Sequence, residues 1–187
     1  NVGQSPYSAS KIAADQLAIS YFKSFDLPVK IVRPFNTYGP RQSARAIIPT
    51  IISQILNGQT CIELGSLTPT RDLTYVGDTC NGFYEIFKSE KAFGDAINIG
   101  MGTEISIGDL VNMIARLMST KIEIRTQETR VRPQNSEVER LLCSNTKLIE
   151  NTNWKPQYTL EQGLAKVIDW MREPEILSTY KPSEYNV

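Results

Sequence analysis

Short β-branched runs alternate with amphipathic helical stretches along most of this chain, and this alternation constrains the fold more than any other feature. Apolar residues recur at helical spacing in several segments, and the runs between them are too short for helices. We expect helices from Tyr7 to about Phe25, over 47–56, from Asp78 to about Lys88, and from 107 and 160 onward. Strands are expected over 29–32, 61–64, 72–76, 96–100 and 122–124, with a turn-rich loop over 33–41. This pattern predicts the α/β class.

Two of the expected helices carry an N-terminal signature. Thr159-Leu-Glu-Gln162 is a capping box, in which the hydroxyl and the later amide satisfy each other's backbone N–H groups. Ser106-Ile-Gly-Asp109 approximates one, with a carboxylate in the position of the amide. We therefore expect these helices to begin directly after Ser106 and Thr159.

The sequence contains no glycine-rich phosphate-binding turn. A complete doubly wound dinucleotide fold starts with a strand and such a turn, whereas this chain enters a helical pattern almost at once and has no G-x-G-x-x-G. We therefore expect the C-terminal part of a Rossmann-like fold, with the N-terminal Gly-rich half absent.

Composition excludes several functional classes. In 187 residues, 41% are hydrophobic, which is enough for a core, and no apolar stretch approaches the ~20 residues of a membrane span. The 20 Lys+Arg balance 20 Asp+Glu, so we expect neither nucleic acid nor a membrane surface as a partner. Three widely spaced cysteines fit a reducing compartment better than a disulfide framework, which predicts a cytoplasmic protein.

The absence of histidine narrows the possible chemistry further. It excludes Ser-His-Asp and Cys-His catalysis within the chain, and we expect no metal site. Tyr7 and Lys11 are four residues apart and project from one helix face, where an ammonium group favours the phenolate form of a tyrosine. Small residues surround this pair, as the approach of a flat cofactor ring requires. The same spacing at Tyr84 and Lys88 indicates an ordinary exposed face, and a surface pair is the alternative interpretation of the first copy.

Three motifs in sequence order carry a family resemblance: Ser5-Pro-Tyr7-Ser-Ala-Ser-Lys11, Arg33-Pro-Phe-Asn36-Thr-Tyr-Gly-Pro40 and Arg71-Asp-Leu-Thr-Tyr75-Val. Together they make the chain resemble the extended short-chain dehydrogenase/reductases, and more narrowly the NAD-dependent sugar-nucleotide epimerases and 4,6-dehydratases. Within these, the chain is most similar to the configuration-retaining UDP-N-acetylglucosamine 4,6-dehydratases of the legionaminic acid type. The resemblance covers essentially the whole chain.

The resemblance implies a division of the chain. Residues 1–42 would be the remnant of the NAD-binding domain that carries the Tyr-Lys helix. Residues 43–175 would form mainly a small α/β domain that binds the nucleotide sugar, with some segments returning to the Rossmann sheet. Residues 176–187 would be a C-terminal arm.

The resemblance also implies roles for individual residues. Tyr7 would be the catalytic acid/base and Lys11 would hold the nicotinamide ribose of NAD. Four more residues would lie next to the cofactor: Pro34, Phe35, Asn36 and Thr37. The residues expected to bind the nucleotide-sugar substrate are Asn36, Ile62, Glu63, Leu64, Arg71, Asn98, Arg132, Asn135 and Ser136. The chain departs from related dehydratases at Ala46, where a lysine is common, and Arg45 stands beside it.

The implied function is part of an NAD-dependent sugar-nucleotide 4,6-dehydratase with a substrate like UDP-N-acetylglucosamine. In that reaction hydride leaves C4, water is eliminated across C5 and C6, and hydride returns to C6. A C4 epimerase of the same family is the first alternative, and a non-catalytic module that binds nucleotide sugars is the second. The resemblance implies a homodimer for the full-length protein, and a chain without the Gly-rich half is expected to be inactive alone.

Overall fold

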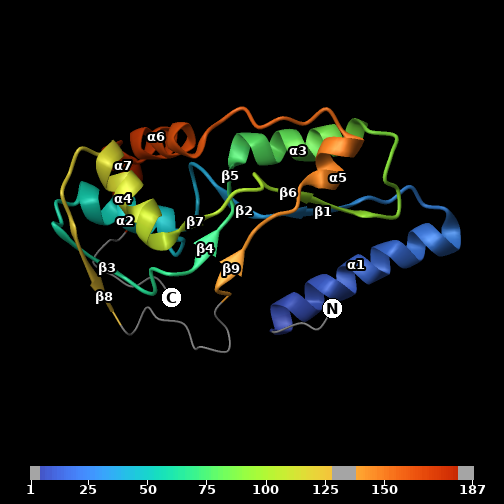
Figure 1. Ribbon diagram of the computed structural model, residues 1–187, viewed down its shortest axis with the longest axis horizontal. Helices are drawn as coiled ribbons and strands as arrows, with labels where there is room; N and C mark the ends of the chain where they lie inside the picture. Colours follow the sequence, from blue (N-terminus) through green and yellow to red (C-terminus); the bar gives the residue numbers. More distant parts are fainter. Residues whose placement is uncertain (1–4, 128–137, 181–187) are drawn as a thin grey trace.

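A computed structural model describes residues 5–127 and 138–180 of the chain (Figure 1). The helices are α1 (Pro6–Phe25), α2 (Ile47–Leu56), α3 (Val76–Lys88), α4 (Ile107–Leu117), α5 (Thr146–Asn151), α6 (Leu160–Met171) and α7 (Pro174–Leu177). The strands are β1 (Ile31–Pro34), β2 (Asn36–Tyr38), β3 (Cys61–Leu64), β4 (Thr70–Arg71), β5 (Leu73–Tyr75), β6 (Ala96–Ile99), β7 (Ile105–Ser106), β8 (Glu123–Thr126) and β9 (Arg140–Leu141).

The strands pair mostly in parallel. β1 pairs with β6, β2 with β5, and β3 with β8, each in parallel. The short strand β4 lies between β9, its parallel neighbour, and β7, its antiparallel neighbour. Parallel partners need long crossover connections, and helices occupy these connections here, as the alternation in the sequence predicts.

The helices gather at two ends of the molecule, and each end has its own hydrophobic cluster, to which α1 contributes no buried residue. In Figure 1, α2, α4, α6 and α7 lie at one end and α1, α3 and α5 at the other, with short strands between them. The larger cluster joins α2, α4 and α6 to β3 and includes Ile48, Ile52, Ile62, Leu110, Ile114 and Leu164. The smaller cluster consists of Ile86, Ile97, Ile99, Leu148 and Trp154.

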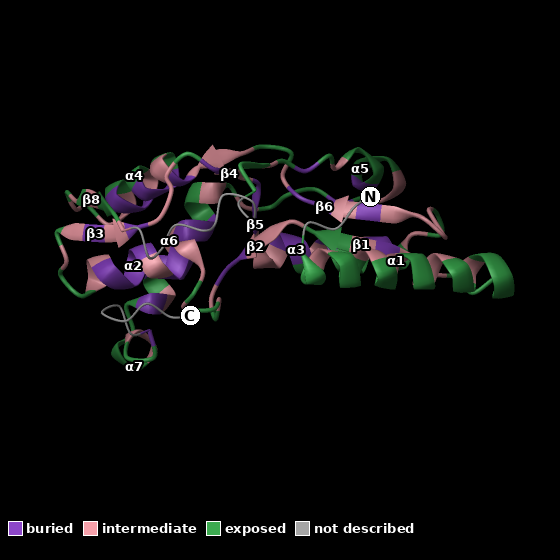
Figure 2. Cartoon of the chain, turned by 90° about the horizontal axis from the view of Figure 1, so that it is seen from below, coloured by how far each residue is buried: buried purple, intermediate pink, exposed green. Residues whose placement is uncertain are grey.

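Helix α1 is capped at its N-terminus and packs on the rest of the molecule without burying any of its residues. Ser5 caps it, because the Ser5 hydroxyl accepts from the Ser8 backbone N–H while the Ser8 hydroxyl accepts from the Ser5 N–H. No residue of α1 is buried, and the helix runs along β1 with most of its surface exposed (Figure 2). The Arg33 Nε of β1 donates to Asp15 Oδ2 of α1 at 2.8 Å, which links the helix to the strand.

Several predicted elements are confirmed within a residue, namely α1, α2, β3 and β6. Both helices begin directly after the predicted cap, since Ser106 and Thr159 each accept a hydrogen bond from the backbone N–H three residues on. Of the two, Thr159 forms the complete capping box, whereas the Asp109 carboxylate accepts from the Ser106 hydroxyl and not from the Ser106 N–H. β1 begins two residues later than expected. The stretch 33–41 was expected to be a loop, but it contains β2, because pairing with β5 supplies an extended partner that the local turn residues do not reveal.

Helix α3 also differs from the prediction. It begins at Val76, directly after β5, and no side chain caps it. Asp78, the expected first residue, is fully buried in the first turn, and its carboxylate accepts from the backbone N–H groups of Gln157 and Tyr158. A residue type that favours helix starts is therefore used here to hold a distant segment.

The described part of the C-terminal segment packs against the larger hydrophobic cluster. Tyr180 is buried, its ring meets Trp170 edge-on at 6.1 Å, and its hydroxyl donates to the Gln42 carbonyl at 2.7 Å. Within the two described ranges, no helix combines the length and the hydropathy that crossing a membrane demands.

Candidate functional site

A cavity of about 350 Å³ brings three of the predicted substrate-binding residues together. Asn36 reaches it from β2, Leu64 from the end of β3, and Arg71 from the end of β4. The beginning of α2 closes another side through Arg45 and Ala46. Residues far apart in the sequence therefore meet around one space, as a binding site in an α/β protein requires.

Asn36 is oriented by the neighbouring strand. Its Nδ2 donates to the Asp72 carbonyl at 3.2 Å, and its backbone is paired with Leu73 in the parallel register of β2 and β5. The amide NH₂ group of Asn36 has two N–H donors. One of them can therefore bind a ligand while the other, bonded to the Asp72 carbonyl, fixes the direction of the side chain.

Arg71 is held at the junction of two cavities. Its Nη1 donates to the carbonyls of Thr70 at 2.8 Å and Val138 at 2.6 Å. Its side chain lines the first cavity and also a second one of about 240 Å³. The two backbone carbonyls fix the direction of the guanidinium group, which brings a positive charge to this junction.

The charge of the first cavity suits an anionic ligand. Its described lining contains Arg45 and Arg71 and no acidic side chain. At its edge, α2 begins directly after Ala46, and no side chain caps the first helical turn. Uncapped backbone N–H groups at a helix start and nearby guanidinium groups both favour negative charge.

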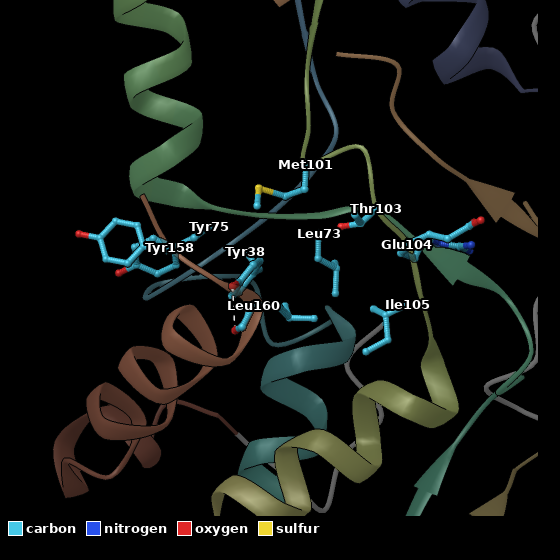
Figure 3. Close-up of a pocket in the computed structure, with 10 residues that line it drawn as sticks. Tyr38, Leu73, Tyr75, Met101, Thr103, Glu104, Ile105, Tyr158 and Leu160 are labelled. Atoms are coloured by element: carbon cyan, nitrogen blue, oxygen red, sulfur yellow. Dashed lines mark hydrogen bonds between the residues drawn. The ribbon is translucent and has the colours of Figure 1, made fainter. Parts of the chain in front are cut away.

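The second cavity is aromatic (Figure 3). Tyr38, Tyr75 and Tyr158 are in contact along one side of it, the first pair edge-on and the second tilted, with ring centroids 5.8 and 4.7 Å apart. The Tyr38 hydroxyl donates to the Leu160 carbonyl. Burial is the main cause that raises the pKa of both Tyr38 and Tyr75. These hydroxyls therefore stay protonated at neutral pH, and neither is suited to the proton-acceptor role predicted for Tyr7.

Tyr7 and Lys11 lie on one face of α1, as predicted. The Lys11 ammonium is 5.8 Å from the centre of the Tyr7 ring, and the Tyr7 side chain is 72% exposed. Within residues 5–127 and 138–180, neither the Tyr7 hydroxyl nor the Lys11 ammonium forms a hydrogen bond with another side chain or backbone group. Figure 1 shows α1 running opposite to β1, with the N-terminal end of the helix toward the middle of the molecule.

Other predicted residues lie elsewhere or are turned away from the cavity. Ile62 is fully buried in the larger hydrophobic cluster, so its side chain does not face a ligand. The Glu63 N–H and carbonyl are both bound by the Gln54 side chain, at 2.9 and 3.3 Å. Asn98, on β6, donates to the Ser144 carbonyl at 3.3 Å and is not part of the cavity lining.

Of the remaining predicted residues, three lie in or beside β1 and β2, and three lie outside the described residues. Pro34 is the last residue of β1 and Phe35 connects it to β2, and the Thr37 hydroxyl lies 3.0 Å from that of Thr79. Arg132, Asn135 and Ser136 lie outside the described residues.

Sequence analysis missed polar residues that line the first cavity, among them Gln42, Thr50 and Ser66. Arg45 was visible only as the neighbour of a departure from the family pattern. The others carry no signal in the sequence, because their position in the cavity arises from packing between distant segments.

Comparisons with known proteins find sugar-nucleotide 4,6-dehydratases and epimerases. The family model described as GDP-mannose 4,6 dehydratase matches residues 2–167. The dTDP-D-glucose 4,6-dehydratase of Homo sapiens is 30% identical over 173 residues, which are 90% of this chain and 48% of that protein.

Solved structures show the same similarity. The dTDP-glucose 4,6-dehydratase of Bacillus anthracis, in complex with NAD, superposes with a TM-score of 0.81 at 30% identity, over 95% of this chain and 55% of that one. The UDP-glucuronic acid 4-epimerase of Bacillus cereus, in complex with UDP-glucuronic acid and NAD, gives 0.82 at 26% identity, over 92% and 54%.

The chain spans about half the length of the relatives that it matches. The superpositions confirm the predicted α/β, Rossmann-like fold across the part of the chain that they cover.

Proposed function

Because the chain belongs to the NAD-dependent epimerase/dehydratase family of extended short-chain dehydrogenase/reductases, we propose that it forms the substrate-binding part of a sugar-nucleotide 4,6-dehydratase. The proposed substrate is a nucleotide sugar like UDP-N-acetylglucosamine. The observation that carries the proposal is the cavity in which Asn36 and Arg71 converge from separate strands without an acidic neighbour in the described lining.

The diphosphate is the part of the substrate that this cavity suits best. Arg71 brings a positive charge to the cavity, and Asn36 an amide group already oriented by the Asp72 carbonyl. Arg45 can supply a second positive charge in place of the lysine that relatives carry at Ala46. Leu64 and the backbone that follows it would border the nucleoside, and we retain Glu63, Asn98, Arg132, Asn135 and Ser136 as proposed contacts.

The NAD site is proposed to use α1. A bound NAD would accept hydride from the sugar and return it. Tyr7 and Lys11 suit the nicotinamide end of such a cofactor, because their polar groups are exposed, neighbouring and free of hydrogen bonds among the described residues. Tyr7 would accept the proton of the sugar hydroxyl, and Lys11 would donate to the ribose and favour the tyrosinate electrostatically. No G-x-G-x-x-G occurs in the 187 residues, so the chain offers no such turn for the pyrophosphate.

A C4 epimerase is the second candidate, supported by the similarity to the Bacillus cereus epimerase. It would use Tyr7 in the same way but without elimination of water. We also propose that the full-length protein is a homodimer that pairs through α1, on which Leu17, Tyr21 and Phe25 form an exposed apolar row.

Calorimetric titration of the 187-residue chain with UDP-N-acetylglucosamine, dTDP-glucose and NAD tests the proposal. We expect the UDP-sugar to bind and NAD to show no measurable binding. Arg71→Ala should raise the dissociation constant of the UDP-sugar roughly ten-fold or more, because a charge-assisted contact is lost.

Arg172→Ala is the matched control, since Arg172 is an exposed arginine paired with Asp169 on α6 and is not part of the cavity lining. An unchanged affinity in Arg71→Ala would remove Arg71 from the site. Preference for dTDP-glucose would assign a different base, and failure of every nucleotide sugar to bind would refute the proposed function.

A further inference from the structure

Two aspartates, Asp72 and Asp78, are fully buried in this chain, and each holds a distant segment through backbone N–H groups. They differ in their position relative to the first cavity, the one of about 350 Å³ that Asn36 and Arg71 line. Asp72 stands between Arg71 and Leu73, both of which line the cavity, whereas Asp78 and the residues that it binds do not. The sequence motif that contains Asp72 assigns no role to it.

The Asp72 carboxylate accepts hydrogen bonds from two separate loops. Its Oδ1 accepts from the Met101 N–H at 2.9 Å, and its Oδ2 accepts from the Gly102 N–H at 2.9 Å and the Cys143 N–H at 3.2 Å. An ionised carboxylate has only acceptor sites, so it can satisfy all three donors at once, and no other side chain of this size can.

The main chain of Asp72 extends this network toward the cavity. Its N–H donates to the Leu141 carbonyl at 2.8 Å, and its carbonyl accepts from Asn36 Nδ2 at 3.2 Å. One residue therefore joins β2, the turn after β6 and the segment that follows β9. The two peptide groups on either side of Asp72 cannot rotate without breaking these hydrogen bonds.

The turn that binds Asp72 is built for close approach. A Cβ at Gly100 would lie 2.3 Å from the Cys143 Cβ and 3.3 Å from Asp72 Oδ2, so no side chain fits there. Gly102 adopts a φ of +74°, a conformation that L side chains rarely take. Both glycines let backbone N–H groups reach the carboxylate.

We propose that Asp72 is a positioning residue for the nucleotide-sugar site, which fixes Arg71 and Asn36 in the orientation that binds the diphosphate. This inference rests on the proposed function. It predicts that the carboxylate acts on binding through its two neighbours, without touching the ligand itself.

The isosteric change Asp72→Asn tests this, because an amide keeps one acceptor and turns an NH₂ group toward backbone donors. Asp78→Asn is the matched control: Asp78 is equally buried, and it accepts from the N–H groups of Gln157 and Tyr158 at 2.8 and 3.2 Å. Both variants should lower the melting temperature. At a temperature where both are folded, Asp72→Asn should raise the dissociation constant for the UDP-sugar ten-fold or more, and Asp78→Asn less than two-fold.

A double variant separates positioning from direct contact. If Asp72 acts through Arg71, then Asp72→Asn should weaken binding less than three-fold in an Arg71→Ala background. If Asp72→Asn does not fold, Gly102→Ala strains the same turn while leaving the carboxylate in place, and it should raise the dissociation constant at least three-fold.

The outcomes distinguish the two proposals. A wild-type chain that binds no nucleotide sugar contradicts the proposed function, whereas an Arg71→Ala variant that binds normally removes Arg71 from the site and overturns the positioning role with it. If Arg71→Ala weakens binding but Asp72→Asn or its Gly102→Ala substitute does not, the positioning role alone is overturned. A full ten-fold effect of Asp72→Asn in the Arg71→Ala background overturns it as well.

Discussion

Replacing Gly163 by alanine should destabilise this chain, although alanine is the better helix former. Gly163 lies in α6, where a Cβ would come within 2.1 Å of the Tyr38 hydroxyl oxygen and 2.8 Å of the Tyr38 Cζ. Tyr38 is 1% exposed and its hydroxyl donates to the Leu160 carbonyl, so the ring cannot withdraw without losing that hydrogen bond.

Three contributions set the magnitude. The helix propensity of alanine favours the variant by about 1 kcal/mol. Overpacking at Tyr38 costs about 1–3 kcal/mol, and a buried hydroxyl that loses its acceptor costs about 1–3 kcal/mol more. The free energy of unfolding should therefore fall by about 3 kcal/mol, and nucleotide-sugar affinity should fall with it, because β2 carries both Tyr38 and Asn36.

Urea unfolding followed by circular dichroism measures the change, with Gly108→Ala as the control. Gly108 lies in the first turn of α4, and its nearest neighbour would be 3.7 Å from an added Cβ, which is ordinary contact. The control should change stability by less than about 1 kcal/mol. A Gly163→Ala variant as stable as the wild type, or equal to the control, would refute the close contact with Tyr38.

Two further predictions concern individual side chains. In an enzyme that contains the complete cofactor site, Tyr7→Phe should lower turnover ~100-fold or more with little change in nucleotide-sugar affinity, since only the proton-transferring oxygen is removed. Steady-state kinetics measure this change, and an unchanged turnover would exclude the acid/base role of Tyr7. Burial, and secondarily the charge of Asp72, raises the pKa of the Cys143 thiol to about 12, so at pH 8 its thiolate fraction is roughly one in ten thousand. In the native chain, iodoacetamide should therefore modify the exposed Cys80 and spare Cys143, as mass spectrometry can show, and equal labelling of both would contradict the burial of Cys143.

Local sequence patterns predicted the elements whose signals are local. The caps at Ser106 and Thr159 and the apolar periodicity of α2 depend on residues within a turn or two of each other, and these elements appear where they were expected. β2 was missed because its three residues become a strand only by pairing with β5, more than 30 residues further on.

The candidate site shows the same division. Asn36 and Arg71 were found through motifs, and both line one cavity. The family resemblance placed both Ile62 and Leu64 at the ligand. Both side chains lie on the buried face of β3, and of the two Leu64, at the end of the strand, also lines the cavity.

By itself, the sequence determined the α/β class, the family motifs, the position of the Tyr7–Lys11 pair on one helix face and the absence of histidine chemistry. Tertiary structure alone decided that Arg45 joins Arg71 at one cavity, and that Asp72 ties three segments behind it. The physical reason is range. Helix periodicity and capping are set by neighbours within a few residues, whereas a cavity and a buried carboxylate depend on which distant backbone groups arrive beside them.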